Sequence, residues 1–223
     1  GRIIDSINLS TDYAGLLRQP WLHSGMKLKI EQIAALLAEL PGDSSVSITK
    51  PSELAKELFT HRGSGTLVRQ GKRIQTAASW SKISKPRLQA LLESGFSKKM
   101  RAEYFADNKP SRIYFSEDYR AALVLLKVAG MDYLDKFAVA EDAQGEGLGS
   151  AAWNVMRQNH PKLFWRSRRE NPINDFYMQA CDGCIKFRHW TVFWYGLDGM
   201  DEIQAAADYC LDKPASFHED RTP

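Results

Sequence analysis

Residues 135–153 read DKFAVAEDAQGEGLGSAAW, an apolar run joined to a run of helix formers through a glycine-rich turn. The apolar segment at 137–140 lies between charged residues, which predicts a short buried strand. Gly145, Gly147 and Gly149 allow backbone angles and close approaches that a Cβ atom would prevent. From Ser150 onward the residues favour a helix. The stretch therefore predicts a strand, a glycine turn and a helix, in that order.

A glycine-lined turn at the start of a helix directs several backbone N–H groups at one point, beside the positive end of the helix dipole. Such a turn favours an anion, typically a phosphate. A kinase-type P-loop ends in Gly-Lys-Ser/Thr, and Gly149-Ser150 lacks the lysine. A dinucleotide-binding turn needs an acidic residue near the tip of the next strand, where this chain has Arg166 and Arg168.

The composition is that of a globular protein, with 223 residues, 43% of them hydrophobic and 26% charged. The net charge of +3 fits a small anionic ligand and is too weak to indicate nucleic acid. No apolar run is long enough to span a membrane and no signal peptide opens the sequence, so we expect a cytoplasmic protein. An odd number of cysteines suits a reducing compartment.

Cys181-Asp-Gly-Cys184 with His189 nearby is the one arrangement that suggests a metal. A structural zinc site needs four ligands, and the sequence has no second cysteine pair. We therefore expect a turn at 181–184 and no metal.

The remaining patterns predict an α/β protein with two unlike halves. In the first half we expect helices at 25–40 and 51–59 and strands at 46–48 and 67–68. In the second half we expect strands at 111–115, 121–128, 132–140, 163–165 and 186–197, the first two forming a hairpin. The expected helices there are 83–92, with Ser84 as N-cap and Gly95 as its stop, and 98–105, 149–159, 173–180 and 201–211.

The motif Gln144-Gly-Glu-Gly147-Leu-Gly149 matches the pattern Q/R-x-x-G-x-G/A. It resembles the GNAT acetyltransferase superfamily, whose turn holds the pyrophosphate of coenzyme A. Four further segments resemble the acetyltransferase domain of N-acetylglutamate synthases: Tyr133-Leu-Asp-Lys-Phe137, Leu163-Phe-Trp-Arg-Ser-Arg168, Asn171-Pro-Ile-Asn174 and Phe193-Trp-Tyr-Gly196. This resemblance covers residues 66 to 217 and implies a GNAT fold, a mixed central sheet flanked by helices.

The first half resembles the end of an amino acid kinase domain of the acetylglutamate kinase family. The matching segments are Gly25-Met-Lys-Leu-Lys29 and the run from Glu57 to Thr66. The resemblance implies that 1–66 is the C-terminal remnant of a kinase domain and that 67–223 is the acetyltransferase domain. Lys29 matches a lysine that stabilises the transferring phosphoryl group, and Glu57 and Gly63–Gly65 match an arginine effector site. The implied partners are a full-length kinase domain and further copies in a homo-oligomer, without nucleic acid or membrane.

The implied activity is transfer of acetyl from acetyl-CoA, the co-substrate, to the α-amine of L-glutamate in arginine biosynthesis. Two alternatives stay open. One is a GNAT enzyme that acetylates another amine, and the other is a non-catalytic module that senses coenzyme A or arginine. A clamp of lysine and arginine side chains favours transfer to glutamate over both alternatives, because glutamate carries two carboxylates.

The family's substrate-binding positions match Lys98, Lys136, Arg168 and Asn171, with Arg166 as a possible assistant. A lysine is usually solvated surface, which is the alternative for Lys98. An unpaired ammonium at Lys136, within an apolar strand, would be costly. Tyr177 matches a tyrosine that protonates the departing thiolate, with packing in the core as its alternative. Glu141, Asp135 or a water relay could accept the amine proton.

For the co-substrate, the resemblance implies two sets of residues. The pyrophosphate cradle consists of Gln144, Gly145, Glu146, Gly147, Leu148, Gly149 and Ser150. Phe137, Ala138 and Val139 would pair with the pantetheine amides as an added strand, and N–H groups of the same strand would stabilise the oxyanion. Trp153, Trp165, Trp190 and Trp194 could stack on adenine, although core packing is the ordinary role of such residues.

Overall fold

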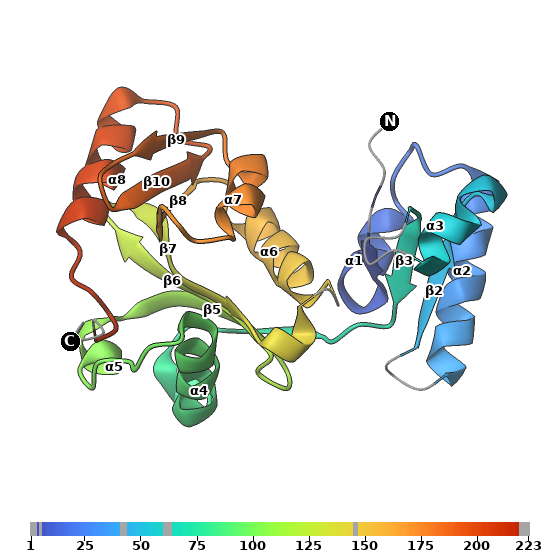
Figure 1. Cartoon of the computed structure of the whole chain (residues 1–223), viewed down its shortest axis with the longest axis horizontal. Coiled ribbons are helices and arrows are strands. Elements are labelled where there is room, and N and C mark those ends of the chain that lie inside the picture. Colours follow the sequence, from blue (N-terminus) through green and yellow to red (C-terminus); the bar gives the residue numbers. More distant parts are fainter. Residues whose placement is uncertain (1–3, 5, 41–43, 60–63, 145–146, 219–223) are drawn as a thin grey trace.

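The computed structural model describes residues 4, 6–40, 44–59, 64–144 and 147–218 of the chain. It contains a three-stranded sheet with the order β1-β3-β2 and a seven-stranded sheet with the order β4-β5-β6-β7-β8-β10-β9. Figure 1 shows the small sheet at one end of the molecule and the large sheet at the other, joined by the segment between β3 and β4. The expected mixed α/β class is confirmed.

The small unit begins with β1 (Ser6–Asn8) and α1 (Leu9–Leu16), which the sequence patterns did not predict. The predicted helices and strands follow as α2 (Ser24–Glu39), β2 (Ser45–Ile48), the 3-10 helix η1 (Pro51–Glu53), α3 (Leu54–Phe59) and β3 (Thr66–Arg69). Ile30 and Leu37, seven positions apart on α2, are buried in its core. Leu28, Leu36 and Phe59 remain exposed, so this unit buries only part of its apolar surface.

The large sheet is built from β4 (Ile74–Ala77), β5 (Pro110–Ser116), β6 (Ala121–Val128), β7 (Met131–Val139), β8 (Leu163–Arg168), β9 (Gly183–Lys186) and β10 (Trp190–Tyr195). All recorded neighbour pairs are antiparallel except β7 and β8, which are parallel. The predicted hairpin of β5 and β6 is confirmed, and Tyr119 N–H closes its turn on the Ser116 carbonyl at 2.8 Å.

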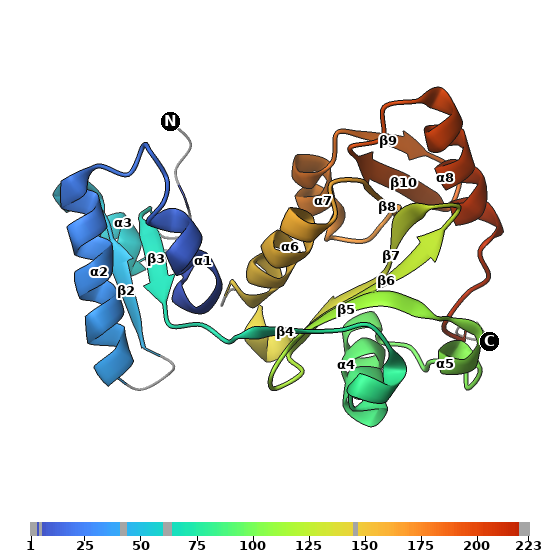
Figure 2. The same cartoon turned by 180° about the vertical axis from the view of Figure 1, so that it is seen from behind.

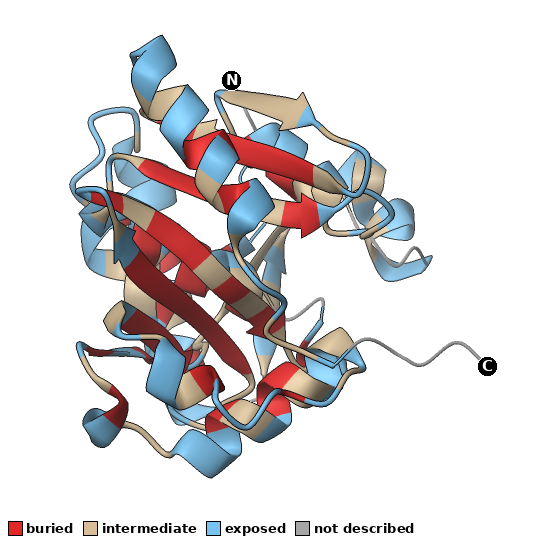
Figure 3. Ribbon diagram, turned by 90° about the vertical axis from the view of Figure 1, so that its left-hand side faces the viewer, coloured by how far each residue is buried: buried red, intermediate tan, exposed pale blue. Residues whose placement is uncertain are grey.

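Helices cover both faces of the large sheet (Figures 2 and 3). On one face lie η2 (Trp80–Lys82), α4 (Lys85–Phe96), α5 (Tyr104–Asp107) and α8 (Met200–Asp212). On the other lie α6 (Leu148–Asn159) and α7 (Asn174–Ala180), while η3 (Glu141–Ala143) connects β7 to α6. This double cover explains why β6 reads as a continuous apolar run, since its alternate side chains enter two different cores.

Two predicted helix details are wrong. α4 does not stop at Gly95 but runs to Phe96, and Ser97, at φ 52°, ends it. Gly95 serves packing instead, because a Cβ there would lie 3.2 Å from Ala138 Cβ on β7. The helix expected at 98–105 is absent; α5 begins only at Tyr104. Glu93 holds the intervening segment by accepting from Lys99 Nζ at 2.9 Å and Met100 N–H at 3.0 Å.

The strand expected at 186–197 is also wrong, because this range contains the last residue of β9, a turn and then β10. β9 and β10 form an antiparallel hairpin whose turn falls at 187–189, with Phe187 N–H donating to the Trp190 carbonyl. Cys184 therefore lies in β9 rather than in the turn predicted at 181–184. The sequence patterns also missed β4, which pairs with β5 at the edge of the large sheet. Among the described residues, no helix is both long and apolar enough to cross a membrane.

Candidate active site

The two parallel strands of the large sheet separate soon after they begin. Over the described strands, the ladder between them joins only Asp132–Leu134 of β7 to Leu163–Trp165 of β8. β7 then continues to Val139 and β8 to Arg168. Main-chain groups on the inner edges beyond that ladder are available to a ligand, because a strand edge without a partner presents unpaired N–H and C=O groups. Phe137, Ala138 and Val139 lie on this open edge.

The glycine turn lies beside the open edge of β7. Gly147 is the N-cap of α6 with φ 74° and ψ 3°, a left-handed conformation that favours glycine. Gly149 allows the close contact between α6 and β7, since a Cβ there would lie 2.8 Å from Val139 Cγ2. Leu148 is buried, whereas Gln144 and Ser150 are exposed. The predicted cradle positions Gly145 and Glu146 lie outside the described residues.

A small cavity separates the first turn of α6 from the small unit. It holds about 20 Å³, room for one water molecule, and Gly147, Ser150 and Asn154 line it on the α6 side. Ser6 and Arg69 line it on the side of the small unit. The Nε atom of Arg69 is buried and has no hydrogen-bond partner among the described residues. The small unit thus borders the turn: a Cβ on Gly147 would lie 3.2 Å from Ser6 Oγ.

Lys136 lies on the face of β7 that packs against α4, α5 and α8. The register between β6 and β7 shifts between Val124 and Leu125, which pair with Lys136 and Leu134 and leave Asp135 as an extra residue. Such a β-bulge turns two consecutive side chains toward one face. Asp135 and Lys136 accordingly both contact Tyr104.

The carboxylate of Asp135 is buried and held by three groups. Its Oδ2 accepts from Lys136 Nζ at 2.8 Å and from the Tyr104 hydroxyl at 2.7 Å, and its Oδ1 lies 3.4 Å from Lys213 Nζ. Burial alone would raise the pKa of Asp135, but attraction to Lys136 and Lys213 lowers it. The carboxylate therefore stays ionised, and its lowered pKa makes it a poor proton acceptor for a substrate amine.

The side chain of Lys136 is only 6% exposed. Besides Asp135, its Nζ donates to Ser216 Oγ at 2.9 Å and lies 5.0 Å from the ring centre of Tyr104. Burial lowers the pKa of Lys136, and the Asp135 carboxylate opposes that shift. Repulsion from the cations Lys213 and Arg166 lowers this pKa further.

Arg166 and Arg168 alternate with buried residues on β8 and face the same side as Lys136. Both guanidinium groups stack on the Trp190 ring, with their Cζ atoms 4.0 Å and 4.1 Å from its centre. Arg166 also donates to the carbonyls of Cys210 and, at 3.4 Å, Pro214. Trp190 thus holds two cations near the point where β7 and β8 part.

Asn171 and Lys98 take different positions. Asn171 shapes the entrance to α7: its Oδ1 accepts from Ile173 N–H at 3.3 Å, and its main-chain N–H donates to the Arg168 carbonyl at 3.1 Å. Lys98 follows the end of α4, is half-buried, and donates its main-chain N–H to the Glu93 carbonyl. It lies on the same face of the sheet as Lys136, adjoining the segment that Glu93 holds.

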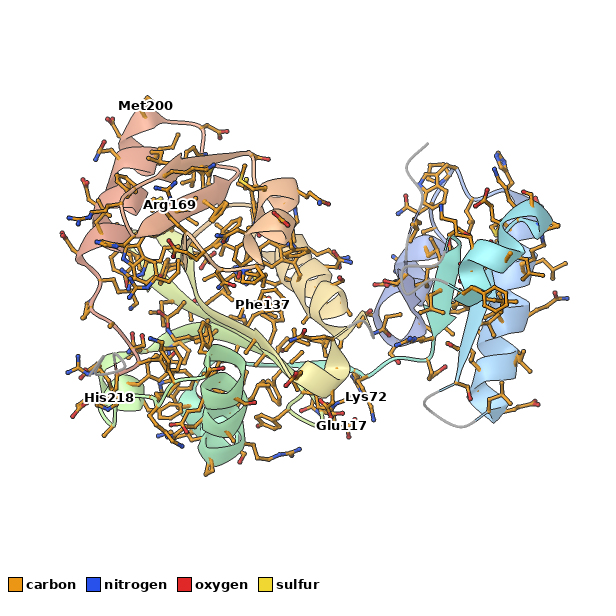
Figure 4. All side chains as sticks on the ribbon, in the orientation of Figure 1. Lys72, Glu117, Phe137, Arg169, Met200 and His218 are labelled. Atoms are coloured by element: carbon orange, nitrogen blue, oxygen red, sulfur yellow. The ribbon has the colours of Figure 1, made fainter. Side chains whose placement is uncertain are left out.

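Tyr177 lies on α7, on the opposite face of the sheet. It is 6% exposed and packs among the rings of Trp153, Trp165, Phe176 and Phe193. Burial raises its pKa, so the phenol stays protonated and suits proton donation rather than proton removal. Phe176 extends this cluster to Phe137 on the open edge of β7, which Figure 4 labels.

Three further tryptophans and Glu141, the remaining candidate for the base, lie away from the cationic residues. Trp153 and Trp165 are buried in the core beneath α6 and α7, and the half-buried Trp194 packs against the core on the other face of the sheet. Glu141 is exposed at the start of η3, which leaves its carboxylate in solvent. In the part of the chain that the structure describes, no group of three or more His, Cys, Asp or Glu side chains could hold a metal ion.

Sequence patterns missed several members of this site. Tyr104, Lys213 and Ser216 surround Asp135 and Lys136, yet they lie far from them along the chain. The nearest sequence signal was the charged pair Asp135-Lys136 inside an apolar strand, which demands partners. Nothing in that signal identifies which residues supply them.

In the small unit, Lys29 and Glu57 have different surroundings. Lys29 lines an open cleft of about 340 Å³ between α2 and β2. Glu57 accepts from Ser47 Oγ and from the N–H groups of Ser64, at 2.5 Å, and Gly65, at 2.8 Å. These bonds, led by that from Ser47, lower the pKa of Glu57. The expected effector position Gly63 lies outside the described residues.

A glycine-capped helix beside two diverging parallel strands is the arrangement expected of an N-acetyltransferase. Comparison with known proteins identifies the same class of protein. Residues 75–213 match the family described as NAT, N-acetyltransferase, of N-acetylglutamate synthase. The chain belongs to this family, and residues 75–213 are its N-acetyltransferase domain.

Similar proteins extend beyond this match. The chain is 55% identical over 218 residues to an acetylglutamate kinase of Xanthomonas campestris pv. campestris, covering 96% of this chain and 51% of that protein. It is 35% identical over 223 residues to the mitochondrial N-acetylglutamate synthase of Homo sapiens, covering 98% of this chain and 42% of that protein. The chain thus spans about half the length of the curated relatives that it matches.

Among solved structures, the N-acetylglutamate synthase of Neisseria gonorrhoeae complexed with coenzyme A and N-acetyl-glutamate is similar, with 16% identity and a TM-score of 0.45. That alignment covers 88% of this chain and 52% of the other.

Proposed function

We propose that this chain transfers the acetyl group of acetyl-CoA to the α-amine of L-glutamate, the first acetylation of arginine biosynthesis. The observation that carries the proposal is the cationic face where β7 and β8 part. Lys136 on β7 and Arg166 and Arg168 on β8 share this face. Glutamate brings two carboxylates, and arginine and lysine donors bind carboxylates through charge-assisted hydrogen bonds. Lys98 and Asn171 are the further substrate ligands that we propose.

The start of α6 and the open edge of β7 fit coenzyme A. The absence of a Cβ at Gly147 and Gly149 supports a cradle there, formed with Gln144, Leu148 and Ser150, for the pyrophosphate. The pantetheine amides would pair with main-chain groups of Phe137, Ala138 and Val139 as an added strand. The thioester then lies near the point where the two strands separate.

Acetyl-CoA supplies a thioester carbon for the amine to attack, so that a C–N bond forms and the C–S bond breaks. N–H groups on the open edge of β7 stabilise the charge that develops on the carbonyl oxygen. Tyr177 donates a proton to the thiolate sulfur that leaves. Because the pKa of Asp135 is lowered and Glu141 is solvated, water accepts the first proton of the substrate ammonium. The second proton, which the nitrogen loses as the amide forms, restores the Tyr177 phenol.

Acetyl-CoA consumption with a panel of amines tests the proposal. We expect turnover with L-glutamate and little with L-glutamine, which lacks the second carboxylate. Preference for another amine would favour a different GNAT enzyme. Binding of acetyl-CoA without turnover of any amine would favour a sensing module.

We also propose that the small unit is the end of an amino acid kinase domain, predicted as 1–66. Its sheet includes β3, which ends at Arg69, so the two units meet in the segment between β3 and β4. The exposed Leu28, Leu36 and Phe59 fit burial beneath the rest of a kinase domain or another copy in a homo-oligomer. The free cysteines support a cytoplasmic, reducing location.

A further inference from the structure

The segment that follows α8 crosses the same face of the large sheet as the cationic residues. In Figures 1 and 2, it runs from the end of α8 toward α5. We call residues 214–218 the strap. Arg101 N–H donates to the Ser216 carbonyl at 3.0 Å, and His218 N–H donates to the Lys99 carbonyl at 2.9 Å. Phe217 stacks on Phe96, with their ring centres 4.8 Å apart.

The strap supplies hydrogen-bond acceptors to two of the three cations in the proposed clamp. Ser216 Oγ accepts from Lys136 Nζ at 2.9 Å, and the Pro214 carbonyl accepts from Arg166 Nη2 at 3.4 Å. The ring centre of Phe217 lies 5.6 Å from Lys136 Nζ. The strap therefore contacts the groups that a substrate carboxylate needs.

The ammonium of Lys136 has no donor left for a substrate. An ammonium has three N–H donors. Those of Lys136 are matched by Asp135 Oδ2 at 2.8 Å, the Asp135 carbonyl at 3.1 Å and Ser216 Oγ at 2.9 Å. A carboxylate oxygen can reach Nζ only if one of these three acceptors leaves.

Ser216 is the acceptor that leaves most readily. Asp135 Oδ2 is charged and also accepts from Tyr104, and the Asp135 carbonyl is part of β7. Ser216 Oγ is neutral and belongs to a segment that lies outside the strands of the large sheet, and among the described residues its main chain pairs with the rest of the fold only around the β-bridge from Met100 to Phe217. Hydrogen bonds between charged partners are stronger than those with a neutral partner.

We propose that the strap competes with the substrate carboxylate for Lys136 and Arg166, and that Ser216 moves away when the substrate binds. This inference rests on the proposed function, because it takes Lys136 as a carboxylate ligand. The strap then acts as a built-in competitor that sets the affinity for the acetyl acceptor.

Kinetics of Ser216→Ala test the proposal. The variant removes the competing acceptor, so we expect the glutamate KM to fall by roughly 3- to 10-fold, since water restores part of a bond to a charged donor. The acetyl-CoA KM should stay within about twofold, because the cofactor edge is not contacted. His218→Ala is the matched control: its side chain is exposed and its main-chain bond to Lys99 persists, so its glutamate KM should not change.

Hydrogen–deuterium exchange of the unmodified chain gives a second readout. Ligand binding ordinarily slows amide exchange, but strap release predicts faster exchange at the amides of Arg101 and His218 when N-acetylglutamate is added. A glutamate KM that is unchanged or raised in Ser216→Ala, or exchange that slows at both amides, would overturn the proposal. If instead the unmodified chain acetylates no glutamate, the proposed function itself fails, and the two failures are therefore distinguishable.

Discussion

Replacing Gly149 by alanine places a methyl carbon 2.8 Å from Val139 Cγ2 and 3.4 Å from Phe137 Cζ. Carbon atoms prefer separations of about 3.5–4.0 Å, so α6 and β7 must move apart by roughly 0.7–1.2 Å at this contact. Val139 is β-branched and cannot readily turn its methyl group aside. Overpacking of this kind costs about 1–3 kcal/mol of folding stability.

The same displacement moves the N–H groups at the start of α6 relative to the open edge of β7. If coenzyme A spans both, loss of one well-placed bond to its charged pyrophosphate should raise the acetyl-CoA Kd by about 10- to 100-fold. Isothermal titration calorimetry measures this Kd, and thermal unfolding measures stability. Gly199→Ala is the control, because an added Cβ there meets no atom within 4 Å. Reduced stability with an unchanged acetyl-CoA Kd would refute our assignment of this contact to the cofactor site.

Four further predictions concern single residues. Gly147→Asp introduces a carboxylate into the cradle and should weaken acetyl-CoA binding by calorimetry while N-acetylglutamate binding is retained; equal acetyl-CoA affinity would remove the cradle from α6. Tyr177→Phe should lower kcat by ~10–10³ with both KM values within about threefold, whereas an unchanged kcat would return Tyr177 to the core. Arg168→Gln should raise the glutamate KM by roughly 10- to 100-fold in steady-state assays, and an unaltered KM would exclude its role as a clamp. Asp135→Asn leaves two buried lysines without their carboxylate and should cost about 3–5 kcal/mol in denaturant unfolding. Because the folded pKa of Asp135 is lowered, its contribution is present above pH ~4 and is lost as the pH falls toward the folded pKa, so this variant should show a smaller acid-induced loss of stability.

The elements predicted well are those whose cause is local. The apolar run of β6, the spacing of apolar residues in α2 and the glycines before α6 each act on neighbouring residues, so a window of sequence contains the whole signal. The match of motif to family placed the acetyltransferase class correctly for a similar reason, because its residues are close together in the turn and in β8.

The elements predicted wrongly are those decided by distant partners. The segment after α4 has helix-forming residues, but Glu93 and the strap hold Lys99 and Arg101 in an extended arrangement. The predicted strand at 186–197 joined the last residue of β9 to β10 because residues 187–195 are rich in aromatic side chains, and only the pairing of Phe187 with Trp190 marks the turn. β4 has no apolar alternation of its own and depends on β5.

The proposed site depends on the β-bulge at Asp135. A prediction that assumes strict alternation of side chains between the two faces of a strand does not detect this bulge. Without an extra residue at Asp135, the side chains of Phe137 and Val139 would follow Tyr133 onto the face of α4 and α8. The bulge reverses the alternation, so Phe137 and Val139 pack toward α6 while Lys136 and Ala138 face the other side. One extra residue thus places the side chains beside the proposed coenzyme A edge on one face of β7 and the cationic Lys136 on the other. The position of Lys136 beside Arg166 therefore follows from the register of β6 against β7 and not from the spacing of charges in the sequence.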